Sequence, residues 1–217
     1  LIYDPEFLTN YEIGFNSNMI NSNFNYSAVL FFSNRNDQQV LISRQVDPTD
    51  PNTFSFITQN AAEGENYGFE FTSNYFVNDN FNVYTNFGLL KTKIKNWESR
   101  NDLINRDQAH APQVTYSIGA NLDLKNNFYL KMNLNGKSSF YYSYSHSNKS
   151  ESFQLVNTTL GYRNKNFTAE FWIRNMMDEY YSTRGFFFGN EAPNFEETLY
   201  RRQGDPRNLG LTLRYNF

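Results

Sequence analysis

The sequence predicts an all-β fold, a transmembrane antiparallel up-and-down β-barrel. Apolar and polar residues alternate with a period of two along nearly the whole chain, which is the pattern of strands with one apolar and one polar face. Several alternating runs extend to about ten residues, the length that a tilted strand needs to cross a bilayer. Short turns alternate with long loops between these runs, which is the asymmetry of outer-membrane barrels.

The first four predicted strands cover residues 11–16, 23–32, 67–72 and 81–89. In each of them, polar residues or glycine occupy most of the positions between the members of an apolar row. The apolar rows are Tyr11, Ile13 and Phe15; Phe24, Tyr26, Ala28, Leu30 and Phe32; Tyr67, Phe69 and Phe71; and Phe81, Val83, Thr85, Phe87 and Leu89. Because successive side chains of a strand point to opposite faces, each row would form one face of its strand.

The remaining predicted strands cover residues 114–124, 128–135, 153–162, 167–174 and 208–217, and the alternation is weakest in the third of these. The apolar rows are Val114, Tyr116, Ile118, Ala120, Leu122 and Leu124; Phe128, Leu130, Met132 and Leu134; Leu160 and Tyr162; Phe167, Ala169, Phe171 and Ile173; and Leu209, Leu211, Leu213, Tyr215 and Phe217. The pattern therefore predicts about nine strands and no helix.

The connections between these strands are of two kinds. Short segments rich in Asn and Asp, which suit hairpin turns with positive φ, cover residues 19–22, 78–80, 126–127 and 164–166. Long polar or aromatic segments cover residues 33–53, 96–111, 141–152 and 176–206. In an outer-membrane barrel the short turns are periplasmic and the long loops extracellular, which would place the C-terminal Phe217 on the periplasmic side. The alternation alone leaves a soluble β-sandwich as the alternative fold.

The composition excludes several other classes of protein. The chain has no cysteine, so it has neither disulfides nor a cysteine-ligated metal site. Lys and Arg total 19 against 22 acidic residues, so the sequence predicts no nucleic-acid partner. An aromatic content of 18% is too high for a disordered chain, and no apolar run is long enough for a membrane-spanning helix. The first residues contain neither an initiator Met nor a signal peptide, so we expect a piece of a longer chain.

Five short motifs resemble those of one family. They are residues 6–14 (EFLTNYEIG), residues 60–70 (NAAEGENYGFE), Ala111-Pro112 with Tyr116, residues 171–181 (FWIRNMMDEYY), and residues 204–211 (GDPRNLGL) with the final Tyr215-Asn216-Phe217. In this order they resemble the C-terminal β-barrel portion of a TonB-dependent outer-membrane receptor of the siderophore-receptor type. Met176-Met177 in place of the usual Leu-Phe, and Phe69 where Val is commoner, are mild departures from the family pattern.

The resemblance implies a larger protein. Members of the family are barrels of about 22 strands whose lumen holds an N-terminal plug. Residues 1–217 would supply the last nine strands, with the plug, the TonB-contacting segment and the earlier strands absent. The implied function is import across the outer membrane of a scarce ligand such as a ferric siderophore, energised through TonB. The implied partners are outer-membrane lipid, the protein's own plug, the TonB complex and the ligand, and Tyr215 and Phe217 would act as the barrel-assembly signal.

Other functions stay open within and beyond this family. A glycan or cobalamin importer is the alternative within it, and a passive outer-membrane channel or a barrel adhesin would share the alternation and the terminal Phe. Neither a G-x-S-x-G hydrolase motif nor a Gly-rich phosphate-binding loop occurs, so the sequence predicts no enzyme, and a hydrolase on a small outer-membrane barrel is the remaining alternative. It also predicts no cofactor and no metal site, because the chain has only two histidines, His110 and His146, without a companion ligand pattern.

Candidate ligand-binding residues must then come from the long loops. The last loop combines charge with aromatic rings, a mixture suited to gripping an anionic aromatic chelate. Its candidates are Arg184, Phe186, Phe187, Phe188, Tyr200, Arg201 and Arg202. Trp97, Tyr142 and His146 are candidates from the other loops. The alternative interpretation is structural: aromatic rings pack in loops or form a girdle at the membrane interface, and exposed arginines are simply solvated.

Overall fold

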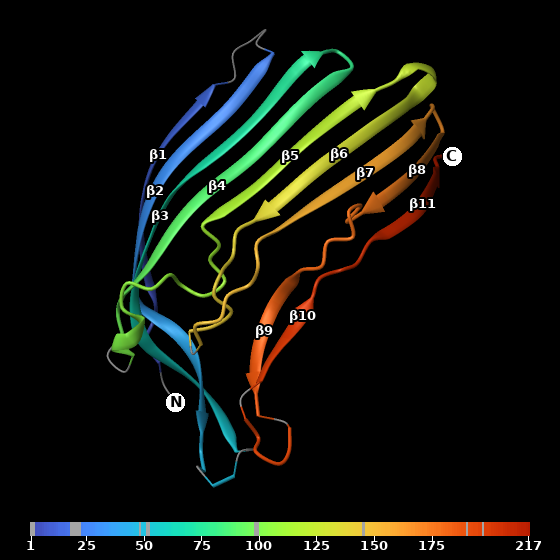
Figure 1. Ribbon diagram of the computed structural model, residues 1–217. Helices are drawn as coiled ribbons and strands as arrows, with labels where there is room; N and C mark the ends of the chain where they lie inside the picture. Colours follow the sequence, from blue (N-terminus) through green and yellow to red (C-terminus); the bar gives the residue numbers. More distant parts are fainter. Residues whose placement is uncertain are drawn as a thin grey trace.

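The computed structural model describes residues 3–17, 23–47, 49–50, 53–97, 100–144, 146–189, 191–196 and 198–217. These residues form a curved antiparallel sheet and a separate two-stranded hairpin (Figure 1). The nine strands of the sheet are β1 (Phe7–Ser17), β2 (Phe24–Gln45), β3 (Phe54–Asn78), β4 (Phe81–Asn96), β5 (Val114–Asp123), β6 (Phe128–Lys137), β7 (Phe153–Arg163), β8 (Phe167–Arg174) and β11 (Asn208–Tyr215). The hairpin consists of β9 (Ser182–Phe188) and β10 (Thr198–Gln203).

The strands of the sheet follow the chain in order from β1 to β8, and β11 then pairs with β8. Each strand pairs antiparallel with its neighbour, so the sheet is an up-and-down wall. Each of the nine predicted strands coincides with one strand of this wall, and three of them extend one or two residues past its end, so the predicted fold class is confirmed. Two 3₁₀ turns, η1 (Asn101–Leu103) and η2 (Lys125–Asn127), are also present. Among the described residues, no helix is long and apolar enough to cross a membrane.

The short turns are built from asparagine as predicted, by two different means. Asn126 and Asn127 have positive φ angles of 59° and 67° between β5 and β6. In the turns between β3 and β4 and between β7 and β8, side-chain oxygens of Asn78 and Asn164 accept backbone N–H groups two residues ahead, at 2.9 and 3.0 Å. The predicted turn at residues 19–22 lies outside the described residues.

The long connections are less irregular than predicted. Residues 33–45, predicted as part of a loop, instead continue β2, which pairs with the first half of β3 through a register shift near Asp37. Residues 176–206, predicted as a loop, contain β9 and β10. The physical reason is the same in both places, because pairing satisfies the backbone N–H and C=O groups of a long excursion. Residues of high β propensity such as Val40 and the Phe186–Phe188 run favour it.

The apolar rows of the wall are exposed rather than buried. Ile13 is 73% exposed, Ile118 43% and Leu211 65%, and no second sheet covers this face in the part of the chain that the structure describes. The opposite face is polar, and its side chains hydrogen bond across strands, as between Asn133 and Ser117 at 2.9 Å. A soluble sandwich would bury the apolar face against a second sheet, so that alternative is wrong. An exposed apolar band is what a lipid-facing barrel wall requires.

Aromatic rings lie over glycines of neighbouring strands. The ring of Tyr84 on β4 covers Gly119 on β5, and a Cβ built on Gly119 would lie 2.1 Å from the Cζ of that ring. The same arrangement joins Tyr129 on β6 to Gly161 on β7. Because these glycines have no side chain, the tyrosine rings of the neighbouring strands can lie flat against the sheet at these positions. At the end of β11, the rings of Tyr215 and Phe217 meet edge to face at 5.1 Å, and both are exposed.

Candidate functional site

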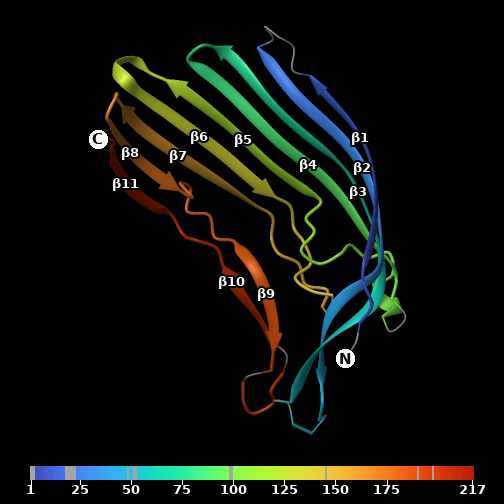
Figure 2. The ribbon, with the colours of Figure 1, turned by 180° about the vertical axis from the view of Figure 1, so that it is seen from behind.

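The long connections of the wall gather at one end of the sheet, opposite the short turns (Figures 1 and 2). The C-terminus lies at the short-turn end, and the N-terminus lies at the end with the long connections. Three of these connections carry the candidate residues: loop 97–113 between β4 and β5, loop 138–152 between β6 and β7, and the β9–β10 hairpin. The candidates from distant parts of the sequence therefore lie at the same end of the molecule.

A small hydrophobic core supports loop 97–113. It consists of Val40, Ala62, Ile94, Trp97 and Leu103, all buried. Trp97 is 3% exposed, and its ring meets that of Tyr144 edge to face at 5.3 Å. The candidate Trp97 thus lies inside this core, where it joins loop 97–113 to loop 138–152, and its ring is not presented to solvent.

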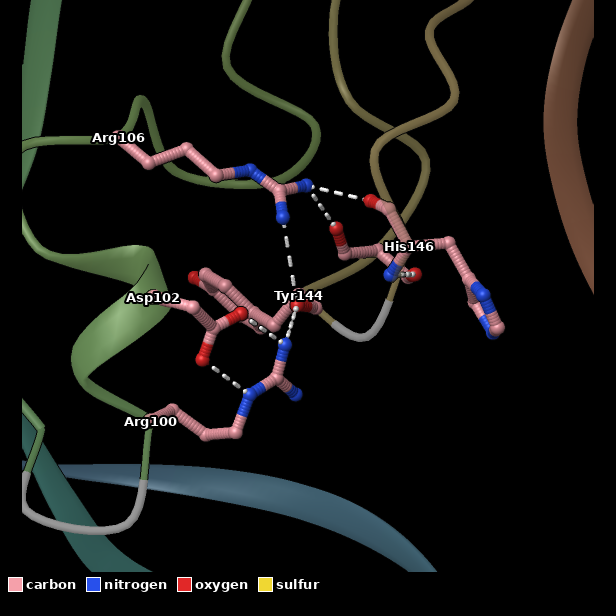
Figure 3. Close-up of polar contacts among 6 residues, drawn as sticks. Arg100, Asp102, Arg106, Tyr144 and His146 are labelled. Carbon is pink, nitrogen blue, oxygen red and sulfur yellow. Dashed lines mark hydrogen bonds and ion pairs between the residues drawn. The ribbon is translucent and has the colours of Figure 1, made fainter.

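Arg106 fastens the two loops together (Figure 3). Its guanidinium donates to the backbone carbonyls of Ser143 at 2.8 Å, Tyr144 at 3.4 Å and His146 at 2.6 Å. The same group lies 3.9 Å from the centroid of the Tyr141 ring. Burial lowers the pKa of Arg106 from its ordinary value, and a guanidinium stays protonated at neutral pH. One cation from loop 97–113 therefore donates to three backbone carbonyls of loop 138–152.

Arg100 adds a second tie beside the first. It donates two hydrogen bonds of 2.9 Å to the Asp102 carboxylate and one of 3.2 Å to the carbonyl of Tyr144. The hydrogen bond from Arg100 lowers the pKa of Asp102, so this carboxylate stays charged at neutral pH. Burial raises the pKa of Tyr144, which keeps its phenol neutral. We call Arg100, Asp102, Arg106 and Tyr144 the loop latch.

Arg106→Ala is expected to loosen loop 138–152 without unfolding the wall. Hydrogen bonds to charged groups are worth about 1.5–3 kcal/mol, so the local opening equilibrium should rise roughly 10- to 150-fold. In the full-length protein, the backbone amides of Tyr142 and Ser150 should exchange faster by this factor. These amides donate to the carbonyls of Asn148 and Phe140 within the loop.

Arg207→Ala is the matched control for the latch, because Arg207 makes only a long, half-exposed ion pair of 3.8 Å with Asp178 through its side chain. Its exchange pattern in loop 138–152 should equal that of the wild type. If Arg106→Ala left the Tyr142 and Ser150 amides as protected as before, the latch would contribute nothing to holding the loop.

One face of the β9–β10 hairpin packs against loop 138–152. Tyr142 is 2% exposed and its ring covers Gly185, where a Cβ would lie 2.6 Å from the ring. The ring of Phe187 stacks on that of His146 with centroids 3.6 Å apart. In Figure 3 the His146 ring points away from the loop latch, while its carbonyl faces Arg106. Arg201 forms an ion pair of 3.6 Å with Glu151 on the same face.

The other face of the hairpin combines cations with aromatic rings. The register pairs Arg184 with Arg202 and Phe186 with Tyr200, so these four side chains and Phe188 share one face. The Arg184 guanidinium lies 5.2 Å from the centroid of Phe186, whose ring stacks with that of Phe188 at 6.3 Å. Like charges directly opposite each other destabilise a strand pair, so the two arginines are better suited to holding an anion than to stabilising the hairpin. We call this set the hairpin cation–aromatic face.

Tyr200 is tied to the tip of the hairpin. Its hydroxyl donates to the Glu191 carboxylate at 2.9 Å, and this hydrogen bond raises the pKa of the phenol. The phenol therefore stays protonated at neutral pH and its ring is oriented beside Phe186. Tyr200 thus adds a fixed neutral ring to the face that carries the two arginines.

The structure sorts the predicted candidates into two groups. Arg184, Phe186, Phe188, Tyr200 and Arg202 form the hairpin cation–aromatic face. Trp97, Tyr142, His146, Phe187 and Arg201 lie in contacts between loops. Sequence reasoning missed Gly185 and Glu151, which join the hairpin to loop 138–152. The sequence did hint at Gly185, because a single glycine stands there between a cation and three aromatic residues. Nothing in the sequence around Glu151 indicates its contact with the hairpin.

Comparisons with known proteins agree with this geometry. A family model described as "TonB dependent receptor-like, beta-barrel" matches residues 2–176, which is more than half of the chain. The crystal structure of the ferric yersiniabactin uptake receptor FyuA from Yersinia pestis superimposes with a TM-score of 0.78 at 15% identity, over 98% of this chain and 30% of that chain. The siderophore receptor PiuA from Acinetobacter baumannii gives a TM-score of 0.75 at 16% identity, over 96% and 28%.

The ferric-catecholate import receptor Fiu from E. coli K12, in its closed form, gives a TM-score of 0.72 at 17% identity, over 99% of this chain and 28% of that chain. At these identities the likeness establishes the fold. The chain spans less than a third of the length of these three proteins, all of which are receptors. With the family match, the shared wall of strands identifies the chain as a member of the TonB-dependent receptor β-barrel family.

Proposed function

We propose that the chain is the C-terminal barrel portion of an outer-membrane receptor that imports a ferric siderophore, energised through TonB. The observation that carries this is the hairpin cation–aromatic face, where Arg184 and Arg202 lie directly opposite each other beside stacked rings. The arginines would bind the anionic groups of an iron chelate and the rings would stack on its aromatic or planar parts. The long-loop end of the wall would be extracellular, and Phe217 would be periplasmic.

The chain's residues would bind and orient the ligand, and no bond of the ligand would be broken. The loop latch would hold loop 138–152 in place, and this loop would in turn support the hairpin through Tyr142 and Phe187. The binding surface would therefore be set before the ligand arrives, which lowers the entropic cost of binding. Passage through the barrel would require the N-terminal plug to be remodelled through TonB.

A glycan importer is the nearest alternative within the family, and the structure weakens the case for it. Sugar sites favour exposed tryptophan rings and carboxylates. Trp97, the tryptophan of the loops, is buried in the small core, and Trp172 lies on a strand of the wall. The hairpin cation–aromatic face instead presents two arginines, which suit an anionic ligand.

The test combines Arg184→Gln with Arg202→Gln in the full-length receptor. Each arginine would lose a charge-assisted contact worth about 1.5–3 kcal/mol, so uptake at limiting ligand should fall about tenfold or more. Cells would be given radioactive iron as ferric citrate, a ferric catecholate or a ferric hydroxamate, and surface amounts of receptor would be measured in parallel. Arg207→Gln, which removes one arginine charge outside the hairpin, should leave uptake unchanged. Equal uptake by the double variant and the wild type would remove the hairpin face from the binding site.

A further inference from the structure

A second group of cations lies on the polar face of the wall, between the short turn that precedes β8 and the far end of β8. Its centre is Tyr129 on β6, which is 4% exposed because its ring covers Gly161 on β7. The Tyr129 hydroxyl donates to the Glu170 carboxylate on β8 at 2.6 Å. These contacts across three strands hold the ring flat against the wall.

Four cationic side chains surround this ring and the neighbouring Trp172. The Lys131 ammonium and the Arg163 guanidinium lie 5.0 and 5.2 Å from the centroid of Tyr129, and the Arg174 guanidinium lies 5.5 Å from the Trp172 ring. Arg214 on β11 and Arg163 on β7 both pair in register with Thr168 on β8, so Arg214 stands beside the same group. We call Lys131, Arg163, Arg174 and Arg214 the cationic wall patch.

The cationic wall patch has an excess of positive charge. The carboxylates that share its face are Glu170, which accepts the Tyr129 hydrogen bond, and Asp123, the register partner of Tyr129 on β5. Neither lies within ion-pair distance of the four cations, and none of the four has an ion-pair partner in the described part of the chain. All four are exposed on the polar face, so their charges face solvent in this structure.

A segment that fills the barrel would change the solvent exposure of these four cations. If the proposed function is right, the polar face lines the lumen and a plug occupies the lumen at rest. Packing a plug against the patch would remove water from four cations, and a buried charge without a partner is strongly destabilising. The plug must therefore bring carboxylates to this part of the wall or leave it wet.

A transported anion is a poorer occupant for the patch. A transport path has to bind its cargo weakly enough to release it, whereas four cations anchored over aromatic rings would retain a polyanion. A resident segment of the protein itself is better suited to permanent pairing. The three similar receptors have chains long enough to contain such a segment, because this chain covers only 28–30% of their length.

From these observations we infer that an acidic segment of the N-terminal plug docks on the cationic wall patch. The inference rests on the proposed function, since it needs a plug. Beyond the presence of a plug, the inference specifies where on the wall the plug binds and that its contact surface is negatively charged. The residues that would bind it are Lys131 and Arg163 around Tyr129, with Arg174 and Arg214 beside them. The inference also predicts that the contact weakens as salt concentration rises.

Zero-length carbodiimide cross-linking of the purified full-length receptor tests the contact directly, because it joins an amine to a carboxylate only where the two touch. Peptide mass spectrometry should find Lys131 linked to an Asp or Glu that precedes residue 1 in the native chain. Lys131→Gln should abolish that link. Lys165, in the short turn between β7 and β8, is the matched control and should form no link to the plug. Links from Lys131 only to carboxylates of the wall, or none, would overturn the docking.

A charge reversal provides an independent measurement. Arg163→Glu with Arg214→Glu should loosen the plug and admit a bulky hydrophilic antibiotic such as vancomycin into cells, whereas Lys165→Glu should not. Normal exclusion of the antibiotic by a folded double variant would also overturn the docking. Reduced iron uptake by the double variant, with normal exclusion and no link from Lys131 to the plug, would assign the patch to passing ligand instead. A native chain with no segment ahead of residue 1 would contradict the proposed function itself, which separates the two failures.

Discussion

Replacing Ile118 with lysine is expected to destabilise the assembled receptor strongly. Ile118 lies in the middle of β5 on the apolar face and is 43% exposed, and no second sheet of the described residues covers it. If this face meets lipid, a lysine near the bilayer midplane costs about 2–4 kcal/mol, or roughly a 30- to 900-fold decrease in the folding equilibrium constant. Folding of the full-length receptor into lipid vesicles, followed by denaturant titration, measures this change.

The matched control for Ile118→Lys is Asn86→Lys. Asn86 lies on β4 opposite Ser117, the residue next to Ile118, but its side chain belongs to the polar face and is exposed. A lysine there should change the folding free energy by less than about 1 kcal/mol, because the charge stays in water. Equal tolerance of both substitutions would mean that the two faces of the wall do not separate lipid from water.

The second large effect is expected from Gly119→Ala. The added Cβ would lie 2.1 Å from the Tyr84 ring, so the ring must leave its seat on the wall. Overpacking of this kind costs about 1–3 kcal/mol. The ring also carries the hydroxyl that accepts a hydrogen bond from Asn133 at 3.2 Å, so its displacement removes a contact between β4 and β6. The same denaturant titration in vesicles should report the loss.

Two further variants test whether Gly119→Ala destabilises the protein through its clash with the Tyr84 ring or because alanine replaces glycine in a strand. Gly14→Ala on β1 should be nearly neutral, since the nearest heavy atom to its Cβ would be 3.5 Å away. Adding Tyr84→Ala to Gly119→Ala should destabilise the protein by less than the sum of the two single effects, because the first alanine removes the ring that the second one strikes. Strictly additive effects would show that the ring and the glycine do not interact.

The strands of the wall could be predicted from the sequence alone. Rows such as Leu209, Leu211 and Leu213 have a period of two, and only a strand places such residues on one face. The asparagine turns at residues 78–80 and 164–166 divided the rows at the correct places. Local pattern succeeded here because the membrane constrains every strand in the same way, whatever the loops do.

The loop contacts could not be read from the sequence, because they depend on distances between segments far apart in the chain. Trp97 was predicted as a ligand candidate from its residue type, and nothing local indicates that Val40 and Ala62 cover it. The hairpin in residues 176–206 was missed because its two strands are short and do not alternate in polarity. Arg201 and Arg202 are neighbours in sequence, yet the register places them on opposite faces, one with Glu151 and one opposite Arg184.

The most direct test of the proposed importer is iron accumulation by cells in which this protein is the only outer-membrane receptor, with TonB present or depleted. Radioactive iron would be supplied as ferric citrate, a ferric catecholate or a ferric hydroxamate. We expect at least one chelate to accumulate when both the receptor and TonB are present, and to stop accumulating when either is removed. Accumulation that persists after TonB depletion would mean a passive channel, and accumulation of none of the chelates would contradict the importer.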